Sequence, residues 1–119
     1  MSNVFKLAAN GIDNQPLTPS DYVNPDNLVS GQATENAQTF LVSEDEKFCV
    51  GVWECSPCCE EIAAYPGDEY CRVLEGEVEI TVDGETTTYR EGDSFAIKKG
   101  TALTWNMTKQ FKKYFALYC

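Results

Sequence analysis

The sequence has 119 residues, the length of one domain, and it contains no histidine. Without imidazole, serine–histidine triads and histidine-bound metal sites are excluded within one chain. Nine Lys and Arg against 19 Asp and Glu give a formal net charge of −10, and every acidic residue lies in 1–93. An acidic surface repels phosphate groups, so we expect neither nucleic acid nor an anionic membrane as a partner. The lysines of 94–119 are expected on a solvated strand and turn, and they are Lys98, Lys99, Lys109, Lys112 and Lys113.

The compartment is predicted from the N-terminus and the cysteines. The first residues, MSNVFKLAAN, contain too short an apolar run for a secretory signal, and no later run has the length of a membrane span. Six cysteines without an export signal are typical of a reducing environment. We therefore expect a cytoplasmic protein with free thiols.

Residues 1–37 are rich in Asn, Asp, Ser and Pro and show no periodicity, which predicts an irregular N-terminal arm packed on a domain formed by 38–119. From there on, short β-rich runs alternate with turn residues. The expected strands include 48–53, Glu77–Val82 and its hairpin partner Glu85–Arg90 across Asp83-Gly84, then Ser94–Ile97, a strand with Leu103, Trp105 and Met107 on one face, and Lys113–Tyr118. About eight or nine short strands at this spacing predict an all-β sandwich or barrel.

Two motifs carry a family resemblance. One is the E-x6-G pattern from Glu69 to Gly76, and the other is the G-D-x-F-x-I-x-x-G pattern from Gly92 to Gly100. With the flanking segment 51–57 and Trp105, the chain resembles a small single-domain cupin, in the branch of ureidoglycine-aminohydrolase-like and ethanolamine-utilisation protein Q-like proteins. The resemblance implies a double-stranded β-helix, the cupin jelly-roll barrel, that forms a homodimer and has its site inside the barrel.

The resemblance also implies a ligand set that this chain lacks. Metal-binding cupins hold their ion with three histidines and a glutamate, and only Glu69 occupies such a position here. The first-motif histidines would fall within 62–65, and the second-motif position is Leu103. One carboxylate with aliphatic neighbours does not hold a transition metal, so either the metal is lost or its ligands are replaced. We therefore expect no cofactor.

Cysteines are the candidates for replacement ligands. Cys55 and Cys58 form a CxxC pair, and Cys71 lies two residues beyond Glu69, so both side chains of that strand face the same way. Cys55 shares its parity with Trp53. Three interpretations stay open, namely thiols that only fill the core, a redox dithiol, and a zinc site. The zinc ligands would come from Cys55, Cys58, Cys59, Cys71 and Glu69.

Glu69 is the main candidate functional residue. A carboxylate inside a barrel needs a partner, so it either serves a polar ligand as an acid, base or hydrogen-bond anchor, or is bonded to a Tyr or Trp of the barrel. Trp53 and Trp105 either pack in the core or form a stacking surface, and Tyr65 is expected near the barrel mouth. The remaining acids of this region, Glu54, Glu60 and Glu61, are expected to be solvated.

The favoured function is the binding of a small polar metabolite in the barrel without a histidine-bound metal. The candidate ligand-binding residues are Glu69, Cys71, Trp53, Cys55, Tyr65, Leu103 and Trp105. One alternative is an enzyme that uses Glu69 on a small nitrogenous or sugar-like compound, with or without a cysteine-bound metal. The other is a non-catalytic dimeric structural subunit, since exposed strand edges can pair with a second copy.

Overall fold

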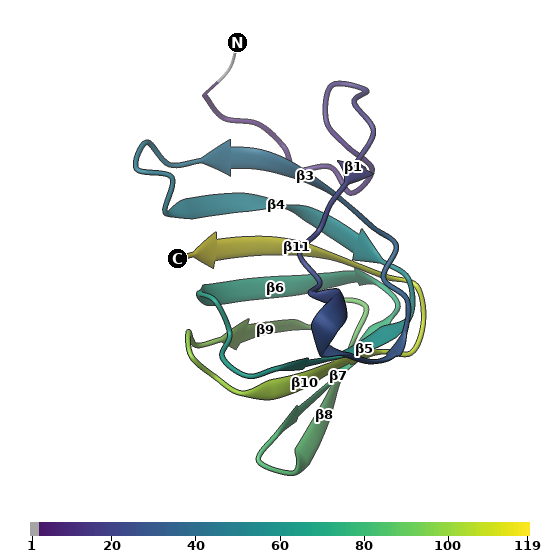
Figure 1. Cartoon of the computed structure of the whole chain (residues 1–119). Coiled ribbons are helices and arrows are strands. Elements are labelled where there is room, and N and C mark those ends of the chain that lie inside the picture. The colour runs from purple at the N-terminus through teal and green to yellow at the C-terminus, as the bar shows by residue number, and fades with distance from the viewer. Residues whose placement is uncertain (1–2) are drawn as a thin grey trace.

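The computed structural model describes residues 3–119, which form two antiparallel β-sheets and no α-helix (Figure 1). The six-stranded sheet has the order β1-β3-β4-β11-β6-β9, and the five-stranded sheet has the order β2-β5-β10-β7-β8. The strands are β1 (Thr18–Pro19), β2 (Leu28–Gly31), β3 (Glu35–Val42), β4 (Phe48–Cys55), β5 (Cys58–Ile62), β6 (Asp68–Glu75), β7 (Glu77–Val82), β8 (Glu85–Arg90), β9 (Ser94–Ile97), β10 (Leu103–Met107) and β11 (Phe111–Tyr118). The predicted all-β jelly-roll class is confirmed. No helix among the described residues is long and apolar enough to cross a membrane.

The predicted hairpin forms as its turn residues dictate. β7 pairs with β8 from Glu77↔Arg90 to Val82↔Glu85, and Asp83 and Gly84 connect them with φ angles of 50° and 80°. Two successive positive φ angles match the twist of a hairpin, and the Asp-Gly pair adopts them at low cost. β9 also has its predicted limits, whereas β11 begins two residues before the predicted Lys113.

Part of the predicted arm belongs to the sheets. β1 pairs with β3, and β2 pairs with β5, so both short strands lie at sheet edges. Between them, Asn24 caps the 3₁₀ turn η1 (Pro25–Asn27), because its side chain accepts a hydrogen bond from the Asp26 amide. β3 itself begins at Glu35, before the predicted start of the barrel domain. The arm therefore covers the sheet edges with paired backbone as well as with irregular chain.

Alternation places one face of the central strands in the core. Trp53 of β4, Trp105 of β10 and Phe111 of β11 meet edge to face, with ring centroids 5.9 to 6.4 Å apart. Phe111 is completely buried, and burial of such a ring contributes roughly 1.5–3 kcal/mol. This aromatic cluster joins the two sheets, and its two indole rings line the candidate site.

Three charged residues differ from the expectation of a solvated surface. Lys112 and Lys113 are 8% and 5% exposed, and Glu60 is 8% exposed, whereas Lys98, Lys99, Lys109 and Glu61 are exposed. The expectation was wrong for Lys113 and Glu60 because their side chains line the cavity between the sheets, and for Lys112 because the N-terminal arm covers it. The Lys112 side chain lies under the N-terminal arm, where its Nζ donates to Asn10 Oδ1 at 2.7 Å and lies 3.4 Å from Glu54 Oε1.

Candidate functional site

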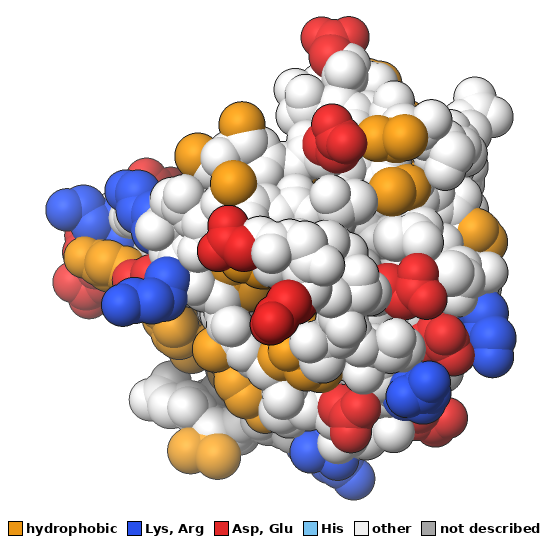
Figure 2. Space-filling view, turned by 90° about the horizontal axis from the view of Figure 1, so that it is seen from below, with side chains coloured by type: hydrophobic (Ala, Val, Ile, Leu, Met, Phe, Trp, Pro, Cys, Tyr) orange, Lys and Arg blue, Asp and Glu red, His pale blue; other side chains and the backbone are white. Residues whose placement is uncertain are grey.

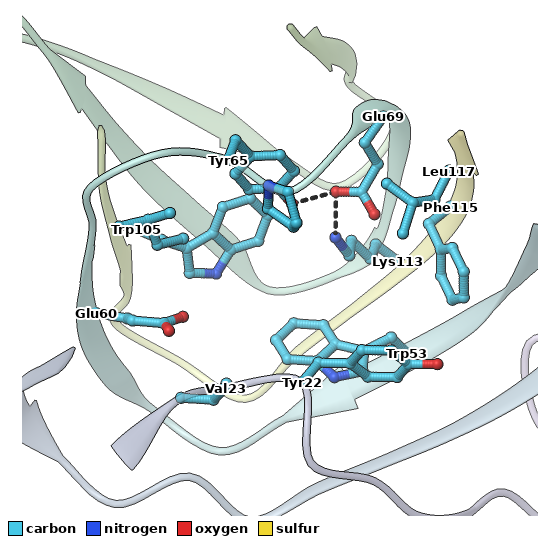
Figure 3. Close-up of a pocket in the computed structure, with 12 residues that line it drawn as sticks. Tyr22, Val23, Trp53, Glu60, Tyr65, Glu69, Trp105, Lys113, Phe115 and Leu117 are labelled. Carbon is cyan, nitrogen blue, oxygen red and sulfur yellow. Dashed lines mark hydrogen bonds and ion pairs between the residues drawn. The ribbon is translucent and has the colours of Figure 1, made fainter. Parts of the chain in front are cut away.

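A cavity of about 150 Å³ lies between the two sheets, and its wall is mostly made of apolar and aromatic side chains (Figure 3). Its polar groups come from Glu60 on β5, Glu69 on β6 and Lys113 on β11, while Tyr22, of which 59% is exposed, lies at its mouth. The remaining wall consists of Val23, Trp53, Ile62, Tyr65, Pro66, Trp105, Phe115 and Leu117. This arrangement of apolar walls with a few polar groups is typical of small-molecule sites.

Strand register brings a buried cation to Glu69. Lys113 stands opposite Trp53 of β4, and on the other side β11 pairs with β6, which carries Glu69 and Cys71. The Lys113 Nζ donates to Glu69 Oε1 at 3.2 Å and to Cys71 Sγ at 3.5 Å. The hydroxyl of Tyr65 donates to the same carboxylate oxygen, as the dashed lines in Figure 3 show. Glu69 is thus held by both a cation and a tyrosine, in line with the expectation that a buried carboxylate needs partners.

The two indole rings complete the surroundings of the ammonium. The Lys113 Nζ lies 4.7 Å from the ring centroid of Trp105 and 5.2 Å from that of Trp53. The negative faces of aromatic rings attract a cation, which offsets part of the cost of removing it from water. Lys113 is therefore enclosed by a carboxylate, a thiol and two π systems.

The protonation states follow from these contacts. Burial by itself lowers the pKa of Lys113, but the neighbouring Cys71, Glu69 and Tyr65 outweigh it, so the net effect is a raised pKa and a charged ammonium at neutral pH. Burial raises the pKa of the Cys71 thiol to about 12 and also raises the pKa of Tyr65, so both groups stay neutral. The network is an ammonium–carboxylate pair with a neutral phenol that donates to Glu69 and a neutral thiol that accepts from Lys113.

The residues present do not fit the histidine-bound metal that the family resemblance implies. Leu103 and Ile62, from the regions where the histidines would stand, pair with each other across β10 and β5. An ammonium group already lies beside the Glu69 carboxylate. Within residues 3–119, no three Cys, Asp or Glu side chains are close enough together to hold a metal ion. The chain therefore has an organic cation beside the carboxylate that, by the resemblance, would be a metal ligand.

The cysteines do not gather in one place. The Sγ atoms of Cys55 and Cys58 lie 4.0 Å apart, buried at the junction of β4 and β5 and outside the cavity wall, and Cys59 is half-buried on the same strand as Cys58. Cys71 lies behind Lys113. Burial raises the pKa of both Cys55 and Cys58, so these thiols are neutral. None of the six cysteines forms a disulfide in the structure.

Four of the predicted ligand-binding residues, Trp53, Tyr65, Glu69 and Trp105, lie in the cavity wall. Leu103 and Cys55 are buried outside that wall, and Cys71 reaches it only through Lys113. Sequence reasoning missed two polar groups of the cavity, Lys113 and Glu60, and Lys113 is the one that contacts Glu69. Its odd-numbered neighbours on the strand, Phe111 and Phe115, point inward, and this period-two pattern was the available signal.

A second buried carboxylate, that of Glu35, binds the chain segment at the mouth of the cavity. Glu35 is 6% exposed and accepts four hydrogen bonds of 2.7 to 2.9 Å. The donors are the Ser20 hydroxyl, the amides of Tyr22 and Val23, and the Trp53 indole nitrogen. Burial opposes ionisation of Glu35, but these donors outweigh it and lower its pKa. Glu35 thus holds segment 20–23 over the cavity.

The indole nitrogen of Trp105 differs from that of Trp53. Among the fully buried side-chain nitrogen and oxygen atoms of residues 3–119, only Trp105 Nε1 has no hydrogen-bond partner. Trp105 is 4% exposed, and Figure 3 shows its nitrogen turned toward the open space above Glu60. An unpaired buried donor costs roughly 1–3 kcal/mol, so this group calls for an explanation.

Charge on the outside is predominantly negative. On the face seen in Figure 2, acidic side chains are spread over the surface, while Lys and Arg side chains lie toward its margins. That face has no continuous positive patch of the kind that binds a phosphate backbone.

Comparison with known proteins gives the same fold. The protein is similar to a putative ethanolamine utilization protein Q from Salmonella typhimurium LT2, with a TM-score of 0.62, 20% identity, and coverage of 71% of this chain and 69% of that one. A protein of unknown function from Pseudomonas syringae pv. tomato DC3000 has a TM-score of 0.81 and 22% identity over 87% of this chain, which spans 45% of the Pseudomonas chain. A Rhizobium leguminosarum protein of unknown function has a TM-score of 0.63 and 18% identity, with 99% and 97% coverage.

The search of curated proteins found no match to the sequence. The model of the EutQ-like cupin domain, however, matches residues 42–115, more than half of the chain. Those residues include both motifs, Glu69, Lys113 and most of the cavity wall. The chain therefore belongs to the EutQ-like cupin family.

Proposed function

We propose that the protein binds a small polar metabolite inside its barrel, where the Lys113 ammonium stands beside Glu69 in place of a histidine-bound metal. The observation that carries this proposal is the Lys113–Glu69 pair in the wall of an aromatic cavity. A hydrophobic core alone gains little from a buried ion pair, since apolar replacements are often as stable. The position of the Lys113–Glu69 pair in the wall of a cavity therefore supports a role in binding.

The size of the cavity limits the ligand. An apolar cavity of about 150 Å³ in another protein admits benzene, which has about six non-hydrogen atoms. A ligand of similar size fits in the cavity beside the indole rings, and a larger one extends through the mouth beside Tyr22. The walls provide apolar surface for its body, and Glu69, Lys113 and Glu60 provide the polar contacts.

A thermal-shift screen of small polar metabolites, followed by calorimetry on the hits, tests the proposal. We expect a hit whose affinity falls at least tenfold in Glu69→Gln and is unchanged in Glu61→Gln, a matched exposed carboxylate. Tyr65→Phe keeps the ring and removes one donor, so it gives a second measurement if Glu69→Gln unfolds. Binding that is intact in both Glu69→Gln and Tyr65→Phe would mean that the ligand lies elsewhere.

Self-association is a second candidate, supported by exposed apolar side chains at one end of the six-stranded sheet. Phe48 and Tyr118, paired across β4 and β11, are 37% and 52% exposed, and Leu41 and Val42 of β3 are 43% and 53% exposed. Such a group of side chains is suited to packing against a second copy. Light scattering on the purified protein should give twice the mass of 13.3 kDa, and Phe48→Ser should lower it to the monomer value.

A further inference from the structure

The unpaired indole nitrogen of Trp105 indicates which class of ligand the cavity accepts. Trp53 and Trp105 face the same cavity, yet only Trp53 has an internal acceptor, Glu35 at 2.9 Å. Trp105 Nε1 is a buried donor without a partner among residues 3–119. A donor that faces a cavity and has no internal acceptor gains a hydrogen bond when a ligand brings an oxygen or nitrogen lone pair.

The charged groups around the cavity oppose a charged ligand of either sign. An anion would come close to the acidic side chains of Glu60, Glu69 and, behind Trp53, Glu35. The Lys113 ammonium, which could attract the anion, is already bonded to Glu69 and Cys71. A cation would need the indole faces, and the Lys113 ammonium already lies over both. The Lys113–Glu69 pair cancels its own charge and leaves Glu60 as the uncompensated acid in the wall, and burial raises the pKa of that carboxyl and so favours its neutral form.

Resting on the proposed function, we propose that the cavity takes a small uncharged molecule whose carbonyl or hydroxyl oxygen accepts the hydrogen bond from Trp105 Nε1. Its body lies against the indole rings and Phe115. Glu60 lies in the same wall, and only one of its oxygens receives a hydrogen bond, from the Asn24 amide at 3.0 Å. It is therefore available to a donor on the same ligand, such as the N–H of an amide. A lactam or a small cyclic ketone has the required shape and chemistry.

Nuclear magnetic resonance on the ¹⁵N-labelled full chain tests this assignment, because the two tryptophans give two indole signals. The probes are 2-pyrrolidinone, the pyrrolidinium cation and the cyclobutanecarboxylate anion. We expect millimolar 2-pyrrolidinone to shift the Trp105 indole proton downfield and to leave the Trp53 signal, already bonded to Glu35, nearly unchanged. The two charged probes should bind at least tenfold more weakly.

Trp105→Phe keeps an aromatic ring and removes the donor, so it should weaken 2-pyrrolidinone about three- to tenfold, which is the value of one hydrogen bond. The control Tyr70→Phe removes an exposed hydroxyl outside the cavity and should leave binding unchanged. If a charged probe binds in the cavity as well as the lactam does, or if the lactam binds without moving the Trp105 signal, the ligand class is wrong although the proposed function stands. If neither these probes nor the metabolite screen gives cavity binding, the proposed function fails as well.

Discussion

Lys113 and Glu69 form an ion pair inside the barrel, with 3.2 Å between Nζ and Oε1 and with 7% and 6% of the two side chains exposed. Each is a charge that water no longer stabilises, so each depends on the other. The pair ties β11 to β6 and determines the polarity of the cavity. The predictions below follow from this pair and from the groups around it.

Replacing Lys113 by Met leaves the Glu69 carboxylate buried with Tyr65 as its remaining donor. We expect a loss of about 3–5 kcal/mol in the free energy of unfolding, because breaking one half of a buried pair exposes the full desolvation cost of the other. Urea denaturation measures this. Lys109→Met removes an exposed partner of Glu77 and should change stability by less than about 1 kcal/mol.

The double variant Lys113→Met with Glu69→Gln removes both charges. It should recover a large part of the stability lost in Lys113→Met, since no uncompensated charge is left. If the double variant is as unstable as the sum of the two single variants, the two residues do not interact energetically, in contradiction to their geometry.

Alkaline pH should destabilise the protein through Cys71. The pKa of the thiol is 9.0 when exposed and about 12 in the folded protein, so the folded state holds this proton more tightly. Its contribution is fully present below pH 9 and is lost as the pH rises toward 12. Lys113, whose folded pKa is also raised, acts in the same direction at still higher pH.

Denaturation at pH 8 and pH 11 tests this sign. Between these two pH values, we expect the free energy of unfolding of Cys71→Ala to fall by about 2 kcal/mol less than that of the wild type. Cys119→Ala, at an exposed cysteine, should lose as much as the wild type. An equal loss in Cys71→Ala and the wild type would show that this thiol does not titrate differently in the two states.

Glu35→Gln should loosen the cavity mouth. The amide cannot accept from the Ser20 hydroxyl, two backbone amides and the Trp53 indole as a carboxylate does, so we expect a stability loss of about 1–3 kcal/mol. Hydrogen exchange of the Tyr22 and Val23 amides should become faster than that of amides in β11. The exposed Glu44→Gln is the matched control.

The lowered pKa of Glu35 also predicts how the stability of the protein changes at acidic pH. Because the folded pKa of Glu35 lies below its ordinary 4.5, its contribution is present above pH 4.5 and is lost as the pH falls through the folded value. Glu35→Gln should therefore show a smaller loss of stability between pH 5 and pH 3 than the wild type. The comparison uses thermal unfolding at both pH values, and an identical acid loss in the two proteins would contradict the assignment.

Thiol reactivity should follow burial. Cys119 is exposed, whereas Cys55, Cys58 and Cys71 are buried and burial raises their pKa values, so iodoacetamide should modify Cys119 first. Peptide mass spectrometry after timed labelling gives the order. In denaturant all six cysteines should react, and a protected Cys55–Cys58 pair under those conditions would indicate a disulfide.

The sequence by itself determined the elements that depend on local chemistry. Asp83-Gly84 is suited to a two-residue turn, and alternation on both sides of it set the limits of β7 and β8. The two glycine-containing motifs indicated the cupin fold, and the family model confirms it over residues 42–115. The parity of Glu69 and Cys71 predicted that both side chains face the same way, and both are buried in the structure.

What replaces the absent histidines was decided only by tertiary structure. Lys113 lies 44 residues from Glu69, and the two meet because β11 pairs with both β4 and β6. Among the lysines of 94–119, charge alone does not distinguish Lys113 from the exposed Lys109, because burial depends on which strands pair. The absence of histidine was visible in the sequence. The positions of the ammonium beside Glu69 and of the unpaired Trp105 donor depend on how the two sheets pack, because the pairing of strands far apart in the sequence is not encoded in any local pattern.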